Sequence, residues 1–349
     1  MMTIMWGLSK RRAEVVLGLL WLIDAVFQLQ PQMFSAKFAK TVLLPVAQSQ
    51  PLFVSSPIRF AVKIFLVDPI LFNSLFVLAQ LLIGVFIINK NTAKIGLRLS
   101  VFWAVLVWIF GEGYGGIFSG HALMLMGETG AAIVYAILAM ALLISYRKPK
   151  KAKFIFAYWL IFFWCIIWLS GAIYQLLPGQ NTAYDLSSML LANTAGAPKV
   201  LRTIDQNSAS FIKSFTTNNK PSQNREVSNI TFETMPSMSG YSISDPTSTN
   251  GYIIIILLAV IQAFIGFGVF LKGLWKKVAL CLGIIISLVF WIVGQNLGNY
   301  YSGTATDLNL GPLIILMALI ILGIDNLDMY LNILGNKLKH LMIGYEARA

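Results

Sequence analysis

Two acidic residues lie within long apolar runs, where a charge is unfavourable. Asp24 is in the middle of the run that follows Lys10-Arg11-Arg12, and Glu112 is near the end of a later run, in the segment WIFGEGYGGIFSGHA. An ionised carboxylate at the centre of a membrane helix costs about 2.5–3.5 kcal/mol on insertion scales. Because a polar partner, water or protonation must offset this cost, both residues are candidates for ligand binding or proton exchange.

Other polar side chains accompany these acids. Gln28 follows Asp24 by one helical turn and therefore shares its helix face. If Asp24 and Glu112 approach each other across packed helices, they titrate as a coupled pair. We therefore hypothesise an outward-facing pocket; an alternative is a network of interhelical hydrogen bonds that only fixes the helix register. The residues assigned to the pocket are Asp24, Gln28, Gln80, Glu112 and His121.

No metal site is predicted. The short cluster of His121, Met124, Met126 and Glu128 contains soft ligands that suit Cu(I). Methionines at the start of a helix more often pack against neighbouring side chains. The two cysteines, Cys165 and Cys281, form neither a CxxC motif nor a zinc-type spacing, which argues against thiol redox chemistry.

The elements that position these residues are membrane spans. Hydrophobic residues make up 57% of the 349-residue chain and charged residues 11%, against about 25% charged in a soluble domain. The net charge of +12 comes largely from short basic clusters between apolar runs, as expected of topology signals rather than of nucleic-acid binding. We predict an all-α, polytopic membrane protein whose partner is the lipid bilayer and not a nucleic acid.

Eight spans are predicted, and the basic clusters give their orientation. With eight spans, the clusters before the first span, after every even-numbered span and after the last one all fall on one side of the membrane. By the positive-inside rule this side is cytoplasmic, so both termini are cytoplasmic and the location is the plasma membrane. The predicted spans are 13–30, 69–89, 97–117, 129–146, 154–177, 251–271, 278–298 and 310–328.

The chain also contains an internal repeat. WLIDAVFQLQP at 21–31 matches WLSGAIYQLLP at 168–178, and WIFGEGYGGIFSGHA at 108–122 matches WIVGQNLGNYYSGTA at 291–305. These matches predict two tandem, parallel four-helix bundles, 1–148 and 149–349, with an outer-loop insertion at 216–249. Glu112 aligns with Gln295 and Asp24 with Gly171, so only the first copy carries the acids. The polar counterparts in the second copy are Gln175, Gln262, Gln295 and Asn296.

Short amphipathic stretches are expected between some of the spans. Those in 34–66 and 181–215 predict helices that lie at the outer membrane surface, although ordinary loops are an alternative. The pairs Gly111-x-x-x-Gly115 and Gly294-x-x-x-Gly298 predict close helix packing, combined with a helix that unwinds at the glycines. Thr304, Thr306 and Asp307 are predicted to cap the last span.

Each half resembles the DoxX-like group of small four-span membrane proteins. The resemblance rests on the basic-then-apolar first span ending in Gln-Leu-x-Pro, on Gln80-Leu-Leu-Ile-Gly84 and on the short basic turn from Asn89 to Arg98. It implies a redox-linked accessory subunit with quinone as a candidate ligand and a soluble or membrane redox subunit as partner. The fusion of two copies and the lack of a cysteine pair depart from that group. A proton-coupled small-molecule transporter and a scaffold without chemistry remain open, and whether the chain is an enzyme is undecided.

Overall fold

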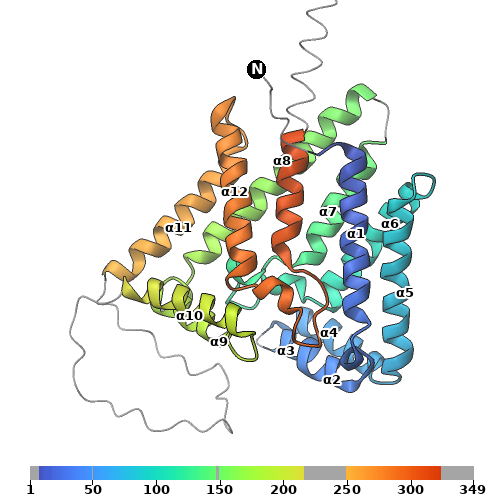
Figure 1. The fold of residues 1–349 in the computed structure, drawn as a ribbon, viewed down its shortest axis with the longest axis horizontal. Coiled ribbons are helices and arrows are strands. Elements are labelled where there is room, and N and C mark those ends of the chain that lie inside the picture. The colour runs from blue at the N-terminus through green and yellow to red at the C-terminus, as the bar shows by residue number, and fades with distance from the viewer. Residues whose placement is uncertain (1–7, 49, 147–148, 216–248, 324–349) are drawn as a thin grey trace, which may run out of the picture.

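The computed structural model describes residues 8–48, 50–146, 149–215 and 249–323. Within these residues the fold is helical and contains no strand. Long helices run side by side, and a group of short helices covers one end of them (Figure 1). The predicted insertion at 216–249, the basic residues after the last span and the end of that span lie almost entirely outside the described residues.

Each of the eight predicted spans corresponds to a helix in the structure. Pro69 and the side chain of Asp68, which accepts a hydrogen bond from the Leu71 N–H at 3.0 Å, start the second of these helices. The helices are α1 (Lys10–Gln28), α5 (Pro69–Ile88), α6 (Ala93–Phe110), α7 (Ala131–Ile144), α8 (Pro149–Gln175), α11 (Thr249–Gly268), α12 (Leu274–Ile292) and the final helix Leu310–Gly323.

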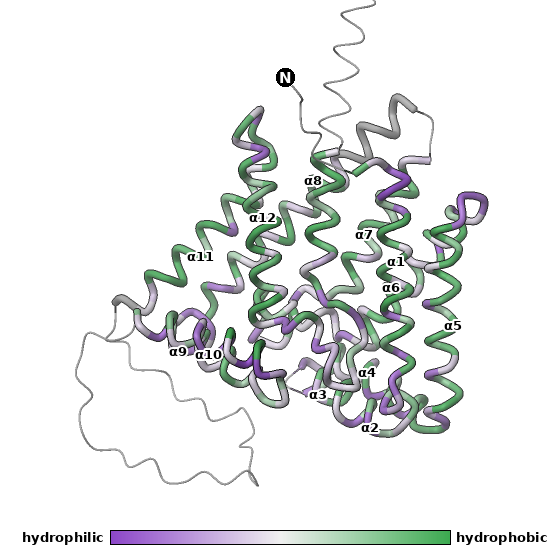
Figure 2. Tube along the Cα trace, viewed as in Figure 1, coloured by the Kyte–Doolittle hydropathy of each residue, from purple (hydrophilic) through white to green (hydrophobic). Residues whose placement is uncertain are grey.

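Among the described residues, 5 helices are long and apolar enough to cross a membrane. They are α5, α6, α12 and the parts Tyr158–Gln175 of α8 and Gly251–Gly268 of α11. The helices Ala131–Ile144 and Leu310–Gly323 are apolar but shorter, and α1 carries several charged residues. Hydrophobic residues dominate the middle of the long helices, and hydrophilic residues gather toward their ends (Figure 2). The helical class and the membrane character are thus confirmed.

Two of the predicted spans are too long at their ends. They were expected to reach residues 117 and 298, but α6 ends at Phe110 and α12 at Ile292. The glycines that follow adopt left-handed backbone conformations, with φ of 55° at Gly113 and 85° at Gly294, which no helix can continue through. The predicted unwinding is therefore present. The prediction that these glycines pack on helix faces is wrong, because they lie in turns.

Short helices form in both outer segments where amphipathic helices were predicted. They gather at the end of the bundle where α1 ends and α5 begins (Figure 1). The first group comprises η1 (Pro31–Phe34), α2 (Ala36–Phe38), the π-helix η2 (Ala39–Leu43), α3 (Leu44–Val46) and α4 (Leu52–Phe65). The second comprises α9 (Ala183–Ala192) and α10 (Lys199–Ser214).

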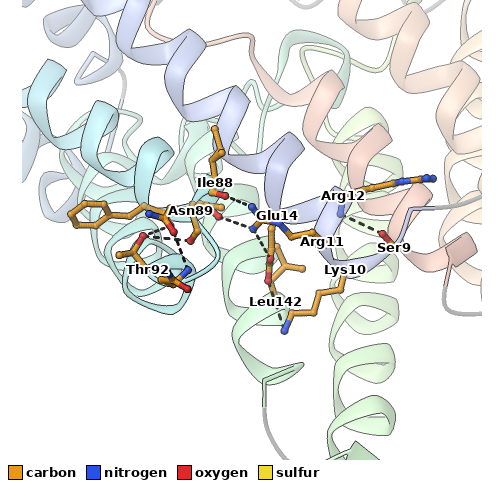
Figure 3. Close-up of polar contacts among 12 residues, drawn as sticks. Ser9, Lys10, Arg11, Arg12, Glu14, Ile88, Asn89, Thr92 and Leu142 are labelled. Atoms are coloured by element: carbon orange, nitrogen blue, oxygen red, sulfur yellow. Dashed lines mark hydrogen bonds and ion pairs between the residues drawn. The ribbon is translucent and has the colours of Figure 1, made fainter.

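The opposite end of the bundle is held by a charged cluster around Glu14. This residue is 2% exposed and pairs with Arg11 at 3.1 Å, while the Tyr146 hydroxyl donates to it at 2.7 Å. Arg11 also donates to the carbonyls of Ile87 and Ile88, the last residues of α5 (Figure 3). A cation at the C-terminus of a helix is favourable, so part of the basic cluster at the start of the chain has a structural role.

Both ends of the described chain lie at this same end of the bundle. The Leu8 N–H donates to the Leu319 carbonyl at 2.9 Å, and a Cβ on Gly323 would lie 2.4 Å from the Leu8 carbonyl oxygen. The end of the last described helix therefore lies next to the start of the first described helix. This closure is what an even number of alternating long helices produces.

Candidate functional site

The two acids of the sequence prediction are positioned by the ends of α1 and α6. Asp24 is 1% exposed, and its carboxyl interacts with the Tyr135 hydroxyl on α7 and the Leu308 backbone N–H, while its Oδ1 accepts no hydrogen bond among the described residues. Trp21, one turn earlier, stacks against the Tyr135 ring with centroids 4.3 Å apart and donates its indole N–H to Ser100 at 2.9 Å. These contacts fix the face of α1 that presents Asp24.

Two glutamines extend the polar face that Asp24 begins. Gln28 is 4% exposed and Gln80 is 6% exposed, and the side-chain oxygen of each lacks a hydrogen-bond partner within the described residues. The backbone carbonyl of Gln28 accepts a hydrogen bond from the Asn73 side chain at 2.8 Å, which ties α1 to α5. Buried acceptors without partners are unfavourable, so these oxygens are candidates for hydrogen bonds from outside the described residues.

Glu112 lies beyond α6 and faces the start of α7. Its Oε1 accepts a hydrogen bond from the Ala132 N–H at 3.0 Å, and its Oε2 lies 3.3 Å from the same nitrogen. The first N–H groups of a helix have no partner within the helix, and the helix dipole favours a negative charge there. The carboxylate therefore caps α7 besides facing the interior of the bundle.

The two glycine-rich segments adopt the same local structure. Gly115 in the first and Gly298 in the second have positive φ, and a Cβ on either would overlap a carbonyl oxygen, that of Thr129 at 1.9 Å and that of Asp307 at 2.5 Å. Each segment thus passes directly against the backbone that precedes the next helix. Only glycine permits both the conformation and the contact.

The tryptophans that begin the two segments anchor them in the same way. The Trp108 indole N–H donates to the Thr129 carbonyl at 3.0 Å, and the Trp291 indole N–H donates to the Leu308 carbonyl at 2.7 Å. Each bond joins the end of one long helix to the chain just before the next.

A cavity of about 1070 Å³ lies at the end of the bundle that carries the short helices. Four of the five residues predicted for the pocket line it: Asp24, Gln28, Gln80 and Glu112. The wall is completed by α2 to α4 on one side and by residues near Tyr301 and Asp307 on the other. The cavity therefore takes its walls from both halves of the chain, whereas the prediction located it in the first half alone.

His121 does not line the cavity. It is exposed, and its ring lies near Gly179, 3.8 Å from where a Cβ on that glycine would be. The Ser119 hydroxyl accepts the His121 N–H at 3.1 Å, which turns the chain away from the pocket at this point. The assignment of His121 to the pocket is therefore corrected.

The four polar counterparts predicted in the second half do not line the cavity either: Gln175, Gln262, Gln295 and Asn296. A Cβ on Gly171 would lie 2.5 Å from Gln262 Oε1. The Gln262 side chain therefore occupies space that is free only because residue 171 is a glycine. The Gln295 amide bonds to the Met124 carbonyl at 3.2 Å, and the Asn296 amide to the Asn193 carbonyl at 3.2 Å. Gln175 is 1% exposed, and its side-chain nitrogen has no hydrogen-bond partner among the described residues. Gln295 thus also joins the two halves.

Tyr135, Glu128 and Asp307 also line the cavity, although the sequence prediction did not assign them to the pocket. Asp307 was assigned only to capping the last span; its Oδ1 instead accepts the N–H of Asn309, the residue before the final helix Leu310–Gly323, at 2.6 Å. Burial raises the pKa of Asp307 above its ordinary value, and burial raises the pKa of Glu128 to about 8. Their acidic character close to a predicted span was the signal available in the sequence.

The described residues contain no group of three or more His, Cys, Asp and Glu side chains arranged to hold a metal ion. Cys165 and Cys281 are not joined in a disulfide. No protein-family model matches the chain, and no curated protein or solved structure matches it either. The resemblance to DoxX-like proteins therefore remains a prediction from the sequence.

Proposed function

We propose that this chain is a multi-pass plasma-membrane protein that binds a small ligand in the cavity beside Asp24. The observation that carries the proposal is a buried carboxyl whose Oδ1 has no partner among the described residues and which faces a cavity of about 1070 Å³. Cavities of about 300–1,000 Å³ are typical of small-molecule sites. An acid retained in a membrane helix is by default a candidate for function.

The proposed topology has eight spans and both termini in the cytoplasm. Five helices meet the length and hydropathy of a span, and the described chain begins and ends at the same end of the bundle. The cluster around Arg11 and the turn between α5 and α6, with Lys90 and Lys94, lie at that end. By the positive-inside rule this is the cytoplasmic end, so the cavity faces outward.

The proposal includes two tandem four-helix units, 1–148 and 149–349. It is supported by the matching bonds of Trp108 and Trp291 and by the matching turns at Gly115 and Gly298. The pairs of helices α1 with α5 and α8 with α11 both pack through a glycine. A Cβ on Gly84 would lie 2.8 Å from the Gly18 carbonyl oxygen, and one on Gly266 would lie 3.3 Å from that of Cys165.

The protein would act as an accessory subunit that holds its ligand for a partner. The resemblance to DoxX-like proteins is the basis for a redox partner and for quinone as a ligand. The cavity supports the binding role by itself, because its lining is predominantly apolar and also includes buried side-chain atoms without partners, among them Asp24 Oδ1, Gln28 Oε1 and Gln80 Oε1.

A proton-coupled transporter is the second candidate function. The observation that favours it is that the cavity takes its walls from both halves of the chain, since Asp307 and Asp24 line the same space. Two units that move relative to each other about a shared site are a common transport arrangement. In that case Asp24 would exchange a proton as the ligand moves, and Asp24→Asn would abolish substrate uptake.

Ligand retention in a cavity-blocked variant tests the binding proposal. Ala61, on α4, lines the cavity, so Ala61→Trp fills it from one side. Ser56, on the same helix, is exposed and does not line the cavity, so Ser56→Trp is the matched control. Small molecules extracted from each purified protein are identified by mass spectrometry.

We expect a small molecule that the wild type and Ser56→Trp retain in near-stoichiometric amount and Ala61→Trp loses by at least about tenfold, a difference of about 1.4 kcal/mol. Equal retention by all three proteins would mean that the cavity is not a binding site. The scaffold reading would then be the remaining one.

A further inference from the structure

The cavity carries acidic groups and no basic ones. Its lining includes the carboxyls of Asp24, Glu112, Glu128 and Asp307, and no Lys, Arg or His is among the described residues that line it. The carboxyls of Asp24, Glu112 and Asp307 are close enough to act on one another electrostatically. An anionic ligand would therefore find no opposite charge in this wall and would be repelled by each carboxyl that is ionised.

Of the five buried side-chain atoms without a partner in the described wall, four accept hydrogen bonds and one, the Trp103 indole N–H, donates. Asp24 Oδ1, Gln28 Oε1 and Gln80 Oε1 are buried, and none has a partner among the described residues. The other acids are already engaged: Glu112 with the Ala132 N–H and Asp307 with the Thr306 hydroxyl at 2.7 Å. A ligand that satisfies these three acceptor oxygens must donate hydrogen bonds to them or carry positive charge near Asp24.

Much of the remaining wall consists of aromatic rings. Phe38, Phe65, Phe76 and Trp103 form a continuous chain in which neighbouring centroids are 5.3, 6.1 and 5.5 Å apart. All four line the cavity. The faces of aromatic rings attract cations and also pack against apolar groups, so this wall suits an organic cation with an apolar part.

A bound inorganic metal ion fits the site poorly. Within the part of the chain that the structure describes, no three carboxyl, imidazole or thiol groups are close enough to coordinate one ion. Calcium and magnesium need about six oxygen ligands at short distance. A diffuse positive charge, as in an alkylated amine or phosphonium, requires no such shell.

We infer that the ligand of this cavity is an amphipathic organic cation, with its charged group beside Asp24 and its apolar part against the rings from Phe38 to Trp103. The inference rests on the proposed function and narrows its ligand class. A quinone, whose oxygens accept hydrogen bonds, would find one unsatisfied donor in the described wall, the Trp103 indole N–H, and would leave Gln28 Oε1 and Gln80 Oε1 without a donor.

Binding of two ions that differ only in charge tests this inference. Tetraphenylphosphonium and tetraphenylborate have nearly the same size and shape and opposite charge. Radiolabelled forms of both, together with the neutral decylubiquinone, are titrated against the full-length protein in lipid nanodiscs, with empty nanodiscs subtracted. The variants are Asp24→Asn and, as the matched control, Asp68→Asn, since Asp68 is exposed, caps α5 and does not line the cavity.

We expect tetraphenylphosphonium to bind at least about tenfold more tightly than tetraphenylborate, which corresponds to about 1.4 kcal/mol. Asp24→Asn should weaken the cation at least tenfold, and Asp68→Asn should leave it unchanged. Equal binding of both ions, or cation binding that is the same in Asp24→Asn, overturns the inference.

Failure of the inference and failure of the proposed function give different results. If decylubiquinone binds and Ala61→Trp blocks it while tetraphenylphosphonium does not bind, the cavity is a ligand site for a neutral molecule and the cation class is wrong. If neither compound binds in a way that Ala61→Trp changes, and no molecule is retained in the extraction experiment, the binding function itself fails.

Discussion

The Glu112 carboxylate and the Gln295 carboxamide make the same hydrogen bond. Each accepts from the backbone N–H of the second residue of the apolar helix that follows, Ala132 and Gly311, and both distances are 3.0 Å. An amide therefore suffices to cap a helix in this setting. The charge of Glu112 is not required for the capping bond, so a separate reason must account for the acid in the first half.

Substitution of Glu112 separates its capping role from its charge. Glu112→Gln should keep the bond to Ala132 and change the unfolding free energy little, whereas Glu112→Ala should cost about 1 kcal/mol, as the loss of a cap does. Thermal unfolding in detergent micelles, followed by circular dichroism, measures both. Gln295→Ala is the matched control, and it also loses the bond to the Met124 carbonyl.

If the charge of Glu112 and not its hydrogen bond stabilises the fold, Glu112→Gln should lose as much stability as Glu112→Ala. Should Glu112→Gln unfold as readily as Glu112→Ala, the capping account would be wrong. In ligand binding, by contrast, Glu112→Gln is expected to differ from the wild type, because the cavity wall loses one ionisable group.

The left-handed glycines predict a graded response to alanine. Gly115→Ala introduces a Cβ that would overlap the Thr129 carbonyl at a φ of 62°, whereas Gly120→Ala has a φ of 79° and nothing within 4 Å. The backbone conformation alone costs about 1–2 kcal/mol in either variant. The overlap adds about 1–3 kcal/mol for Gly115→Ala alone.

Thermal unfolding of the two variants and of Gly298→Ala checks this ranking. We expect Gly115→Ala and Gly298→Ala to lower the Tm clearly more than Gly120→Ala does. Equal losses in all three would show that the segments relax away from the following helix, and the tight contact would not hold the site together.

The positions of the helices and of four pocket residues could be predicted from the sequence for a physical reason. Long apolar runs must be helical in a membrane, because every backbone group has to be paired internally. The residues Asp24, Gln28 and Gln80 stand out in such runs simply because polar groups are rare there. Helical spacing then puts Asp24 and Gln28 on one face.

The remaining features depend on contacts between distant segments. In the sequence, Tyr135 is one more residue of an apolar helix. Only the packing of α7 against α1 brings its hydroxyl to Asp24. His121 lies close in sequence to the glycine-rich segment, but a turn directs it to the exposed surface. The ends of α6 and α12 could not be read from hydropathy, because positive φ is a backbone property that the apolar pattern does not report.

The half-buried carboxyl of Glu128 predicts a pH dependence of stability. Burial raises its pKa from the ordinary 4.5 to about 8, so the folded protein keeps a proton that the unfolded chain releases. Stability is then fully present below about pH 4.5, falls as the pH rises and levels off above about pH 8. Asp307, whose pKa burial also raises, contributes in the same direction.

Comparing Glu128→Gln with the wild type isolates this contribution. The amide keeps an acceptor for the Leu123 N–H, which Glu128 now accepts at 3.2 Å, but does not titrate. We expect the Tm of the variant to decline less steeply than that of the wild type between pH 5 and 8, with a residual slope from Asp307. Parallel curves would mean that folding does not raise the pKa of the Glu128 carboxyl.

The proposed topology predicts which loops reagents can reach from outside the cell. Asn91, in the turn between α5 and α6, and His121, between α6 and α7, are both exposed and lie at opposite ends of α6. The positive-inside rule puts Asn91 in the cytoplasm and His121 outside. With Cys165 and Cys281 replaced by alanine, a membrane-impermeant maleimide should label His121→Cys in intact cells and Asn91→Cys only after permeabilisation. Labelling of Asn91→Cys alone in intact cells would reverse the orientation, and the cavity would then open to the cytoplasm.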